Sequence, residues 1–196
     1  HKAEMAEHLV RIEKLKKLSA LGKLEVIYEW IDRFLETDEK LVVYAHHKDI
    51  VKNLADKYNA PSITGETKLE DRQKAVDKFQ TDETCKIIVA NIQAGGVGIT
   101  LTAASNVLFV EFAWNPGTHD QAEDRLHRIG QKDEVTAWYL VGKDTIDEDI
   151  IELIEKKRKI VTGATEGGED TERMSILGEL IGRMTPNHQL GVKTIR

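Results

Sequence analysis

The chain has 196 residues, of which 40% are hydrophobic and 32% charged, a balance typical of a soluble globular protein with one large domain and an appendage. Its formal net charge of −6 argues against indiscriminate electrostatic binding to nucleic acid but leaves room for a local basic groove. The single cysteine, Cys85, excludes an internal disulfide and a cysteine-rich metal site, and no apolar run approaches the length of a membrane span, so no membrane partner is expected.

Helix and strand patterns alternate along the first half of the chain. In chain order, the predicted elements are a helix at residues 1–20, a helix at 23–35, a strand at 40–45, a helix that ends near Tyr58, a strand at 60–64 and a helix at 69–80. The strand at 40–45 is a short β-branched apolar run, KLVVYA, of the kind that parallel sheets bury on both faces.

The same alternation continues through the second half. The predicted elements are a strand at 85–90, a strand at 106–112, a helix that starts at Pro116 and carries residues 120–131, a strand at 134–141 and an amphipathic helix at 144–161. Strands that alternate with helices indicate βαβ units, and hence an α/β fold with a doubly wound parallel sheet and helices on both faces. The working loops of such sheets lie at the carboxyl ends of the strands.

The composition changes after residue 161. Residues 162–172 are glycine-rich and acidic, which indicates a linker, and residues 173–196 are expected to form a short helical or flexible tail. With a helical extension at residues 1–21, this leaves residues 22–161 as the main domain. The chain opens with His1 rather than Met, which suggests a fragment of a longer protein.

A glycine-rich stretch, QAGGVGIT, follows the strand at 85–90. Its glycines, Gly95, Gly96 and Gly98, let a backbone turn tightly and approach a ligand without obstruction by a Cβ atom. The spacing matches neither a Walker A loop nor the dinucleotide fingerprint. A ligand-facing loop and a purely structural turn therefore both stay open.

Two arginines stand three residues apart in the stretch DQAEDRLHRIGQ. On a helix Arg125 and Arg128 lie about one turn apart, so both side chains can point in one direction. Paired guanidinium groups suit a triphosphate because they supply forked donors and stay charged. The neighbouring acids Glu123 and Asp124 also fit a solvent-exposed helix laced by salt bridges.

Polar and aromatic residues follow two of the predicted strands. The stretch YAHHK presents His46, His47 and Lys48, which suit contacts with a phosphate backbone, although a polar loop at a helix start explains them as well. Trp114 in AWNPG is either a core residue or a wedge against a nucleic-acid groove. His127 suits packing or hydrogen bonding better than metal ligation, and no metal site is predicted.

Taken in order, these stretches resemble a known family. The series LVVYAHH, ITGETKLEDRQKAVDKFQ, IIVANIQAGGVGITLTAASNVLFVEFAWNPG and DQAEDRLHRIGQ closely resembles the second RecA-like lobe of Snf2-family ATPases, which are helicase-superfamily-2 motors that translocate on double-stranded DNA. The resemblance covers residues 22–161 and implies a RecA-like form of the doubly wound sheet. The AHH ending of the first stretch is similar to the annealing-helicase branch. The helix after Asp144 resembles the brace that packs back across the lobes.

The resemblance implies a role for the arginines. In this family ATP sits between two RecA-like lobes, and the second lobe supplies an arginine finger. Arg125 and Arg128 would therefore face the γ-phosphate as catalytic residues, which stabilise the charge that develops in phosphoryl transfer. Gln121, Gly96 and Gly98 would lie at the nucleotide. The implied cofactor is ATP with Mg²⁺ in the full two-lobe protein, with none bound tightly by this lobe alone.

The resemblance also implies a DNA interface. The residues placed near the tracked strand are His46, His47, Lys48, Thr64, Gly65, Arg72, Asn91, Gln93, Trp114 and Asn115. The implied partners are double-stranded or forked DNA and the upstream N-terminal RecA-like lobe of the same protein. Two positions depart from the family: Gln93 stands where many relatives have a basic residue, and Glu111 stands at or near the position where many have Asp.

Two motifs of a complete motor are absent from the sequence, namely a Walker A loop and a D-E-x-[HD] sequence. We therefore expect that the chain alone does not hydrolyse ATP appreciably. Two other functions stay open. One is a non-catalytic RecA-like scaffold for DNA or protein binding. The other is an RNA helicase lobe, although in RNA helicases the motif that here reads DQAEDRLHRIGQ typically ends in GRxGR. A DNA motor implies the cytoplasm or nucleoid in a prokaryote or virus and the nucleus in a eukaryote.

Overall fold

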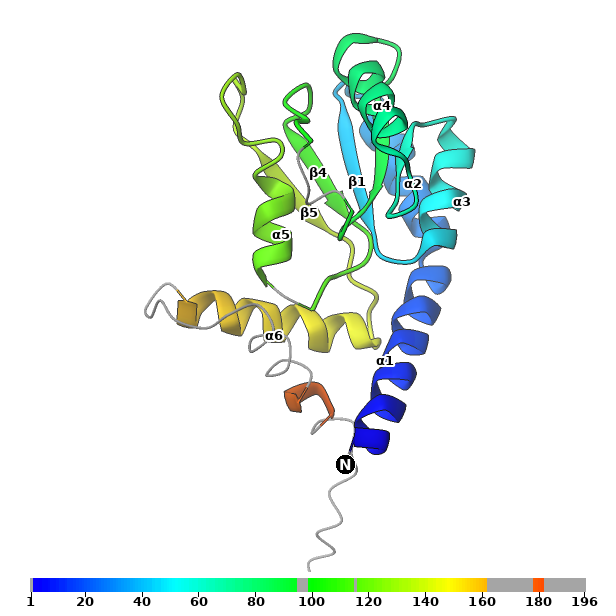
Figure 1. Cartoon of the computed structure of the whole chain (residues 1–196), viewed down its shortest axis with the longest axis vertical. Helices are drawn as coiled ribbons and strands as arrows, with labels where there is room; N and C mark the ends of the chain where they lie inside the picture. The colour runs from blue at the N-terminus through cyan, green and yellow to red at the C-terminus, as the bar shows by residue number, and fades with distance from the viewer. Residues whose placement is uncertain (1, 95–98, 115, 162–177, 182–196) are drawn as a thin grey trace, which may run out of the picture.

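The computed structural model describes residues 2–94, 99–114, 116–161 and 178–181. Its centre is a five-stranded sheet of order β2-β3-β1-β4-β5 (Figure 1). The strands are β1 (Leu41–Ala45), β2 (Ser62–Ile63), β3 (Ile87–Asn91), β4 (Asn106–Phe109) and β5 (Thr136–Tyr139). Every neighbouring pair runs parallel, which confirms the predicted α/β sheet.

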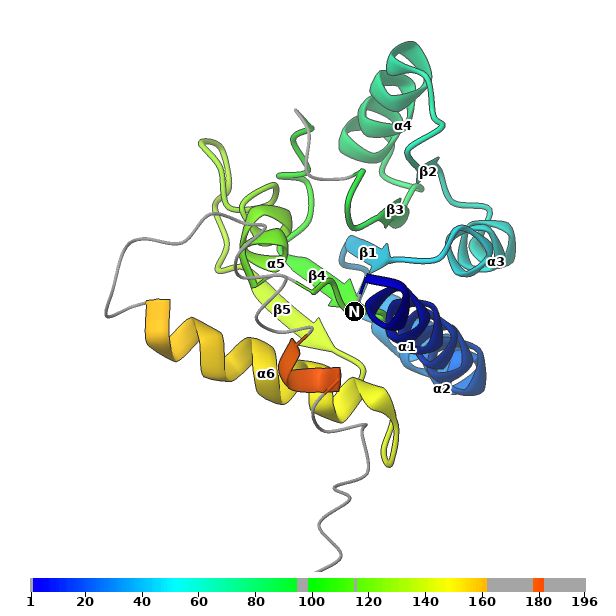
Figure 2. The ribbon, with the colours of Figure 1, turned by 60° about the horizontal axis from the view of Figure 1, so that its bottom comes forward.

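The helices cover both faces of this sheet. They are α1 (Lys2–Gly22), α2 (Leu24–Leu35), α3 (Lys48–Tyr58), α4 (Leu69–Thr81), α5 (Pro116–Glu123) and α6 (Ile146–Val161). One apolar cluster joins α2 and α3 to one face, and another joins α4, α5 and α6 to the opposite face. Figure 2 shows α2 and α3 on one side of the sheet and α5 and α6 on the other.

The central strand explains why the sheet needs cover on both sides. All five residues of β1 are fully buried. Because side chains alternate along a strand, Val42 and Tyr44 face α4 and α5, whereas Val43 and Ala45 face α2 and α3. A strand buried on both faces reads as a continuous apolar run, which is the pattern found in the sequence.

Several predicted boundaries are corrected. The strand expected at 60–64 is only Ser62–Ile63, the strand expected at 106–112 ends at Phe109, and the strand expected at 134–141 is only Thr136–Tyr139. The helix that starts at Pro116 ends at Glu123 and does not extend to residue 131. The backbone beyond it bonds to another segment instead, since the Leu101 N–H donates to the Arg125 carbonyl at 2.9 Å.

The segment after α5 is also held by a side chain and shaped by a glycine. The Gln131 side-chain amide donates to the Ala104 carbonyl at 2.7 Å, which ties the segment to the loop that enters β4. Gly130 has φ of +108°, a conformation that side-chain-bearing residues rarely adopt. In Figure 1 the loop between α5 and β5 lies at the opposite end of the sheet from α1.

Two terminal helices meet at the carboxyl end of the sheet. Lys23, just after α1, donates to Asp147 of α6 at 2.6 Å and to the Leu140 carbonyl at 2.6 Å. Residues 178–181 are helical, with Leu180 fully buried and Glu179 paired to Lys156 at 2.6 Å. The rest of the predicted tail and the predicted linker at 162–172 lie outside the described residues. No helix among those described combines the length and apolar character needed to cross a bilayer.

Candidate nucleotide and DNA interface

A buried carboxylate, Glu111, fixes the loop that follows β1. It is 3% exposed, and its Oε2 accepts the backbone N–H groups of His46 and His47, both at 2.8 Å. Its Oε1 lies 2.5 Å from Nδ1 of His47. Burial by itself raises the pKa of Glu111, but the hydrogen bonds from His47 and His46 outweigh it and hold the pKa below its usual range.

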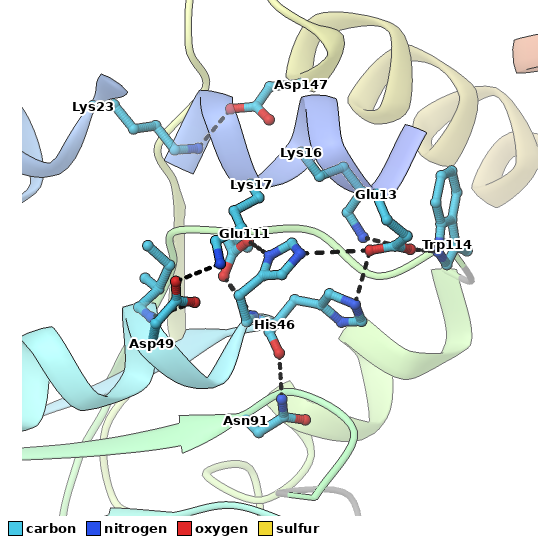
Figure 3. Close-up of polar contacts among 12 residues, drawn as sticks. Glu13, Lys16, Lys17, Lys23, His46, Asp49, Asn91, Glu111, Trp114 and Asp147 are labelled. Atoms are coloured by element: carbon cyan, nitrogen blue, oxygen red, sulfur yellow. Dashed lines mark hydrogen bonds and ion pairs between the residues drawn. The ribbon is translucent and has the colours of Figure 1, made fainter. Parts of the chain in front are cut away.

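A second carboxylate, that of Glu13, reaches the same histidines from α1, and Figure 3 shows it beside His46. Glu13 Oε2 lies 3.2 Å from Nε2 of His46 and 3.7 Å from Nε2 of His47. Its Oε1 accepts the indole N–H of Trp114 at 3.0 Å and lies 3.8 Å from Nζ of Lys16. Burial raises the pKa of Glu13, whereas the bond to His46 and the charge of Lys16 lower it, with a net value of about 2.

These contacts determine how accessible the side chains of the two histidines and Trp114 are to a ligand. The histidine side chains are 17% and 18% exposed and are engaged by Glu13 and Glu111. Trp114 is 4% exposed, with Lys16 Nζ 4.5 Å from its ring centroid, so its side chain belongs to the core in this conformation. Their predicted contacts with DNA stay predictions, and they require this network to open.

Asn91 joins the loops that follow β1 and β3. Its side-chain amide donates to the His46 carbonyl, and its Oδ1 accepts the backbone N–H of Gln93 at 2.9 Å. The side chain of Gln93 is exposed. Asn91 therefore orients a loop that presents Gln93 to solvent. Three predicted site residues, Gly96, Gly98 and Asn115, lie outside the described residues, as does the neighbouring Gly95.

A turn after β2 forms a second part of the same edge. The Arg72 guanidinium donates to the Thr64 carbonyl at 3.1 Å and to the Thr67 carbonyl at 2.9 Å, so it braces the turn from α4. Gly65 is exposed at its tip, with nothing within 4 Å of a Cβ placed there. Beside it, exposed Lys48 pairs with Glu66. The structure thus brings the loops after β1, β2 and β3 to one edge, as expected for a parallel sheet.

The arginines occupy a different part of the fold. Arg128 is exposed, and its Nη1 donates to Thr100 Oγ1 at 3.2 Å. Arg125 is partly buried near Tyr44: burial raises the pKa of the Tyr44 hydroxyl, and the charge of Arg125 acts in the opposite direction. Because α5 ends at Glu123, the two arginines lie on turns and not one helical turn apart, which corrects the expected geometry. Gln121 is exposed on α5.

Sequence reasoning missed three members of this site. Glu13 and Lys16 lie on a helix that was expected to be an extension outside the main domain, and they are at least 30 residues from His46 in the sequence. Glu111 was noted only as a departure from the family pattern. The one local signal for Glu111 was its place at the end of an apolar stretch, because a buried acid requires hydrogen-bond donors nearby.

Comparison with known proteins gives consistent matches. Residues 22–130 match the family model described as the helicase conserved C-terminal domain. A Xenopus laevis protein described as SWI/SNF-related matrix-associated actin-dependent regulator of chromatin subfamily A-like protein 1 is 39% identical over 149 residues. The DNA annealing helicase and endonuclease ZRANB3 of Homo sapiens is 35% identical over 163 residues.

These matches cover most of this chain but only a small part of each relative. They cover 73% and 80% of this chain but only 16% and 15% of the two relatives. A crystal structure of the C-terminal part of the Fun30 ATPase domain is similar with a TM-score of 0.63 at 27% identity, over 83% of this chain and 54% of that one. The chain thus spans less than a fifth of the length of these two curated relatives.

Proposed function

Because this chain belongs to the helicase conserved C-terminal domain family and is a second RecA-like lobe of the Snf2 type, we propose that it is the C-terminal motor lobe of an ATP-dependent double-stranded DNA translocase. The predicted RecA-like sheet and the predicted likeness to annealing helicases are both confirmed. In the proposed motor, this lobe supplies arginine fingers and DNA-tracking loops. The proposal implies the nucleus in a eukaryotic source and the cytoplasm or nucleoid otherwise.

The anchoring of the arginine segment carries the nucleotide half of the proposal. The Arg125 carbonyl accepts the Leu101 N–H and the Gln131 side-chain amide donates to the Ala104 carbonyl, which ties the segment to the loop before β4, while the guanidinium of Arg128 stays at the surface. A cation held on a rigid backbone and exposed at its tip can meet a γ-phosphate presented by another lobe. Positioned charge of this kind stabilises a phosphoryl-transfer transition state without further reorganisation.

The carboxyl edge of the sheet supports the DNA half. Exposed Lys48, the Thr64–Gly65 turn and exposed Gln93 lie on adjacent loops, and Arg72 and Asn91 hold those loops in place. Polar side chains and free backbone groups on several loops suit contacts with phosphates, which position a protein on DNA without reading sequence. Closure of two lobes on ATP would move this edge along the duplex, and hydrolysis would reset it.

The proposal is tested in the full two-lobe protein with ATP, Mg²⁺ and DNA. We expect Arg128→Ala to lower DNA-stimulated ATP turnover by about 10³-fold or more. Arg33→Ala is the matched control, because Arg33 is exposed in the last turn of α2 and should leave turnover unchanged. Unchanged turnover in Arg128→Ala would show that the finger assignment is wrong.

The nucleic acid that best activates ATP turnover distinguishes the proposed motor from the two other functions. Duplex, forked and single-stranded DNA and RNA are compared as activators of the parent protein. Stronger activation by RNA would favour an RNA helicase lobe. DNA binding with no ATP turnover in the parent would favour a non-catalytic scaffold, and either outcome would overturn the proposed motor.

A further inference from the structure

We propose that Glu13, His46 and His47 form a binding site for a Zn²⁺-type transition-metal ion that fastens α1 to the carboxyl end of β1. One ligand atom from each residue lies within 4.8 Å of the others. One carboxylate and two imidazoles are a ligand set that zinc accepts, with a water in the fourth position. This proposal does not rest on the proposed motor function, although His46 and His47 also belong to the proposed DNA interface.

The distances from Glu13 to the two histidines are close to those of a tetrahedral site. Ligands bound at about 2.0–2.1 Å in a tetrahedron lie about 3.3 Å from one another. Glu13 Oε2 lies 3.2 Å from Nε2 of His46 and 3.7 Å from Nε2 of His47. Figure 3 shows that Glu13 reaches His46 from α1, and because the three ligand atoms lie within 4.8 Å of one another, an ion between them needs only small side-chain movements.

The groups behind the ligands orient them for metal binding. Nδ1 of His47 lies against the buried carboxylate of Glu111, the arrangement that fixes a ligating imidazole with its Nε2 lone pair outward. Glu13 uses its other oxygen, Oε1, for the indole N–H of Trp114, and Lys16 lies on that same side. Oε2 therefore remains directed at the histidines. His47 is the better oriented of the two imidazoles.

The site also has a path to solvent. A hollow of about 400 Å³ is lined by apolar and charged side chains of α1, together with Glu13 and His47. An ion can therefore enter without unfolding of the core, which is a requirement for a site built on a folded protein. Because Glu13 lies on α1 whereas the histidines follow β1, a bound ion would add a link between these two segments.

The test uses the whole chain after removal of metals with a chelator. Zn²⁺ is titrated calorimetrically, and Co²⁺ is added separately because its visible absorption distinguishes four-coordinate from six-coordinate sites. We expect one Zn²⁺ per chain, an intense four-coordinate Co²⁺ spectrum and a higher Tm with Zn²⁺. Glu13→Gln and His46→Gln should each weaken binding by at least about 10-fold.

Matched variants outside the cluster control for surface binding. Glu29→Gln and His127→Gln change exposed residues of the same types and should leave the affinity unchanged. Absence of Zn²⁺ binding, a six-coordinate Co²⁺ spectrum, or a Zn²⁺ affinity in Glu13→Gln and His46→Gln equal to that of the parent chain would overturn the proposal. If His46→Gln fails to fold, the parent spectrum and Glu13→Gln still decide, since the glutamine oxygen can keep the bond from Trp114.

Discussion

At the scale of single residues, two carboxylates hold the loop after β1 from opposite sides. Glu111, two residues beyond β4, accepts two backbone N–H groups and faces the His47 ring, whereas Glu13 approaches from α1. Both acids are ionised at neutral pH because donors around them outweigh the effect of burial on the pKa. The loop therefore has a defined conformation before any ligand arrives.

Removal of Glu111 should cost considerable stability. We expect Glu111→Ala to lower the free energy of unfolding by about 2–4 kcal/mol, because donors at His46 and His47 would lose their partner in a buried position. Glu111→Gln keeps one acceptor oxygen and should cost less. Urea unfolding measures both, with Glu29→Ala at an exposed site as the control. Equal stability of Glu111→Ala and the parent would contradict this account.

The two arginines should differ in their effect on stability. Arg128 is exposed, so Arg128→Ala should change the free energy of unfolding by less than about 0.5 kcal/mol. Arg125 is partly buried beside Tyr44, and Arg125→Ala should cost about 1–3 kcal/mol. Thermal unfolding of the isolated chain compares them. A large loss in Arg128→Ala would mean that its loss of ATP turnover reflects unfolding.

At the scale of elements, α1 is part of the folded domain. Lys23 follows it and reaches Asp147 of α6, and their side chains are only 10% and 5% exposed. Burial lowers the pKa of Lys23, and the charge of Asp147 partly restores it. The predicted extension at residues 1–21 thus packs on the lobe through Glu13 and Lys17, with Lys23 directly after it, and the division of the chain into domains stays a prediction.

The buried pair gives a prediction for this contact between helices. Lys23→Met alone leaves the Asp147 carboxylate buried without its cation, so we expect a loss of about 3–5 kcal/mol in unfolding free energy. Lys23→Met combined with Asp147→Asn removes the unpaired charge and should cost less than Lys23→Met alone. Urea unfolding of the two variants measures the difference. A double variant less stable than Lys23→Met would show that the charge is not the cause.

At the scale of the whole molecule, the proposed nucleotide site is only partly present in this chain. The arginines lie beside Thr100 and Tyr44, whereas no Walker A loop occurs in the sequence to bind phosphates and Mg²⁺. The loops proposed to contact DNA lie at the carboxyl edge of the sheet, and the arginine segment is tied to the loop that enters β4. In the proposed motor, a second lobe therefore meets one surface while DNA meets another.

The isolated chain should accordingly have no measurable DNA-stimulated ATP turnover. Phosphate release by the purified chain with ATP, Mg²⁺ and duplex DNA should equal the rate without protein. The full two-lobe protein under the same conditions is the positive control. Turnover by the isolated chain that disappears in Arg128→Ala would contradict the expected division of the site between lobes.

The sequence by itself determined the parallel sheet, the helices on both faces and the family. These features depend on local periodicity and on residues that follow each other closely, such as the buried run of β1 and the spacing of the arginines. Only the tertiary structure decided that α5 ends at Glu123, that Trp114 is buried, and that Glu13 meets His46. The physical reason is that these outcomes depend on contacts between distant segments, which compete with local preferences and leave no periodic signal in the sequence.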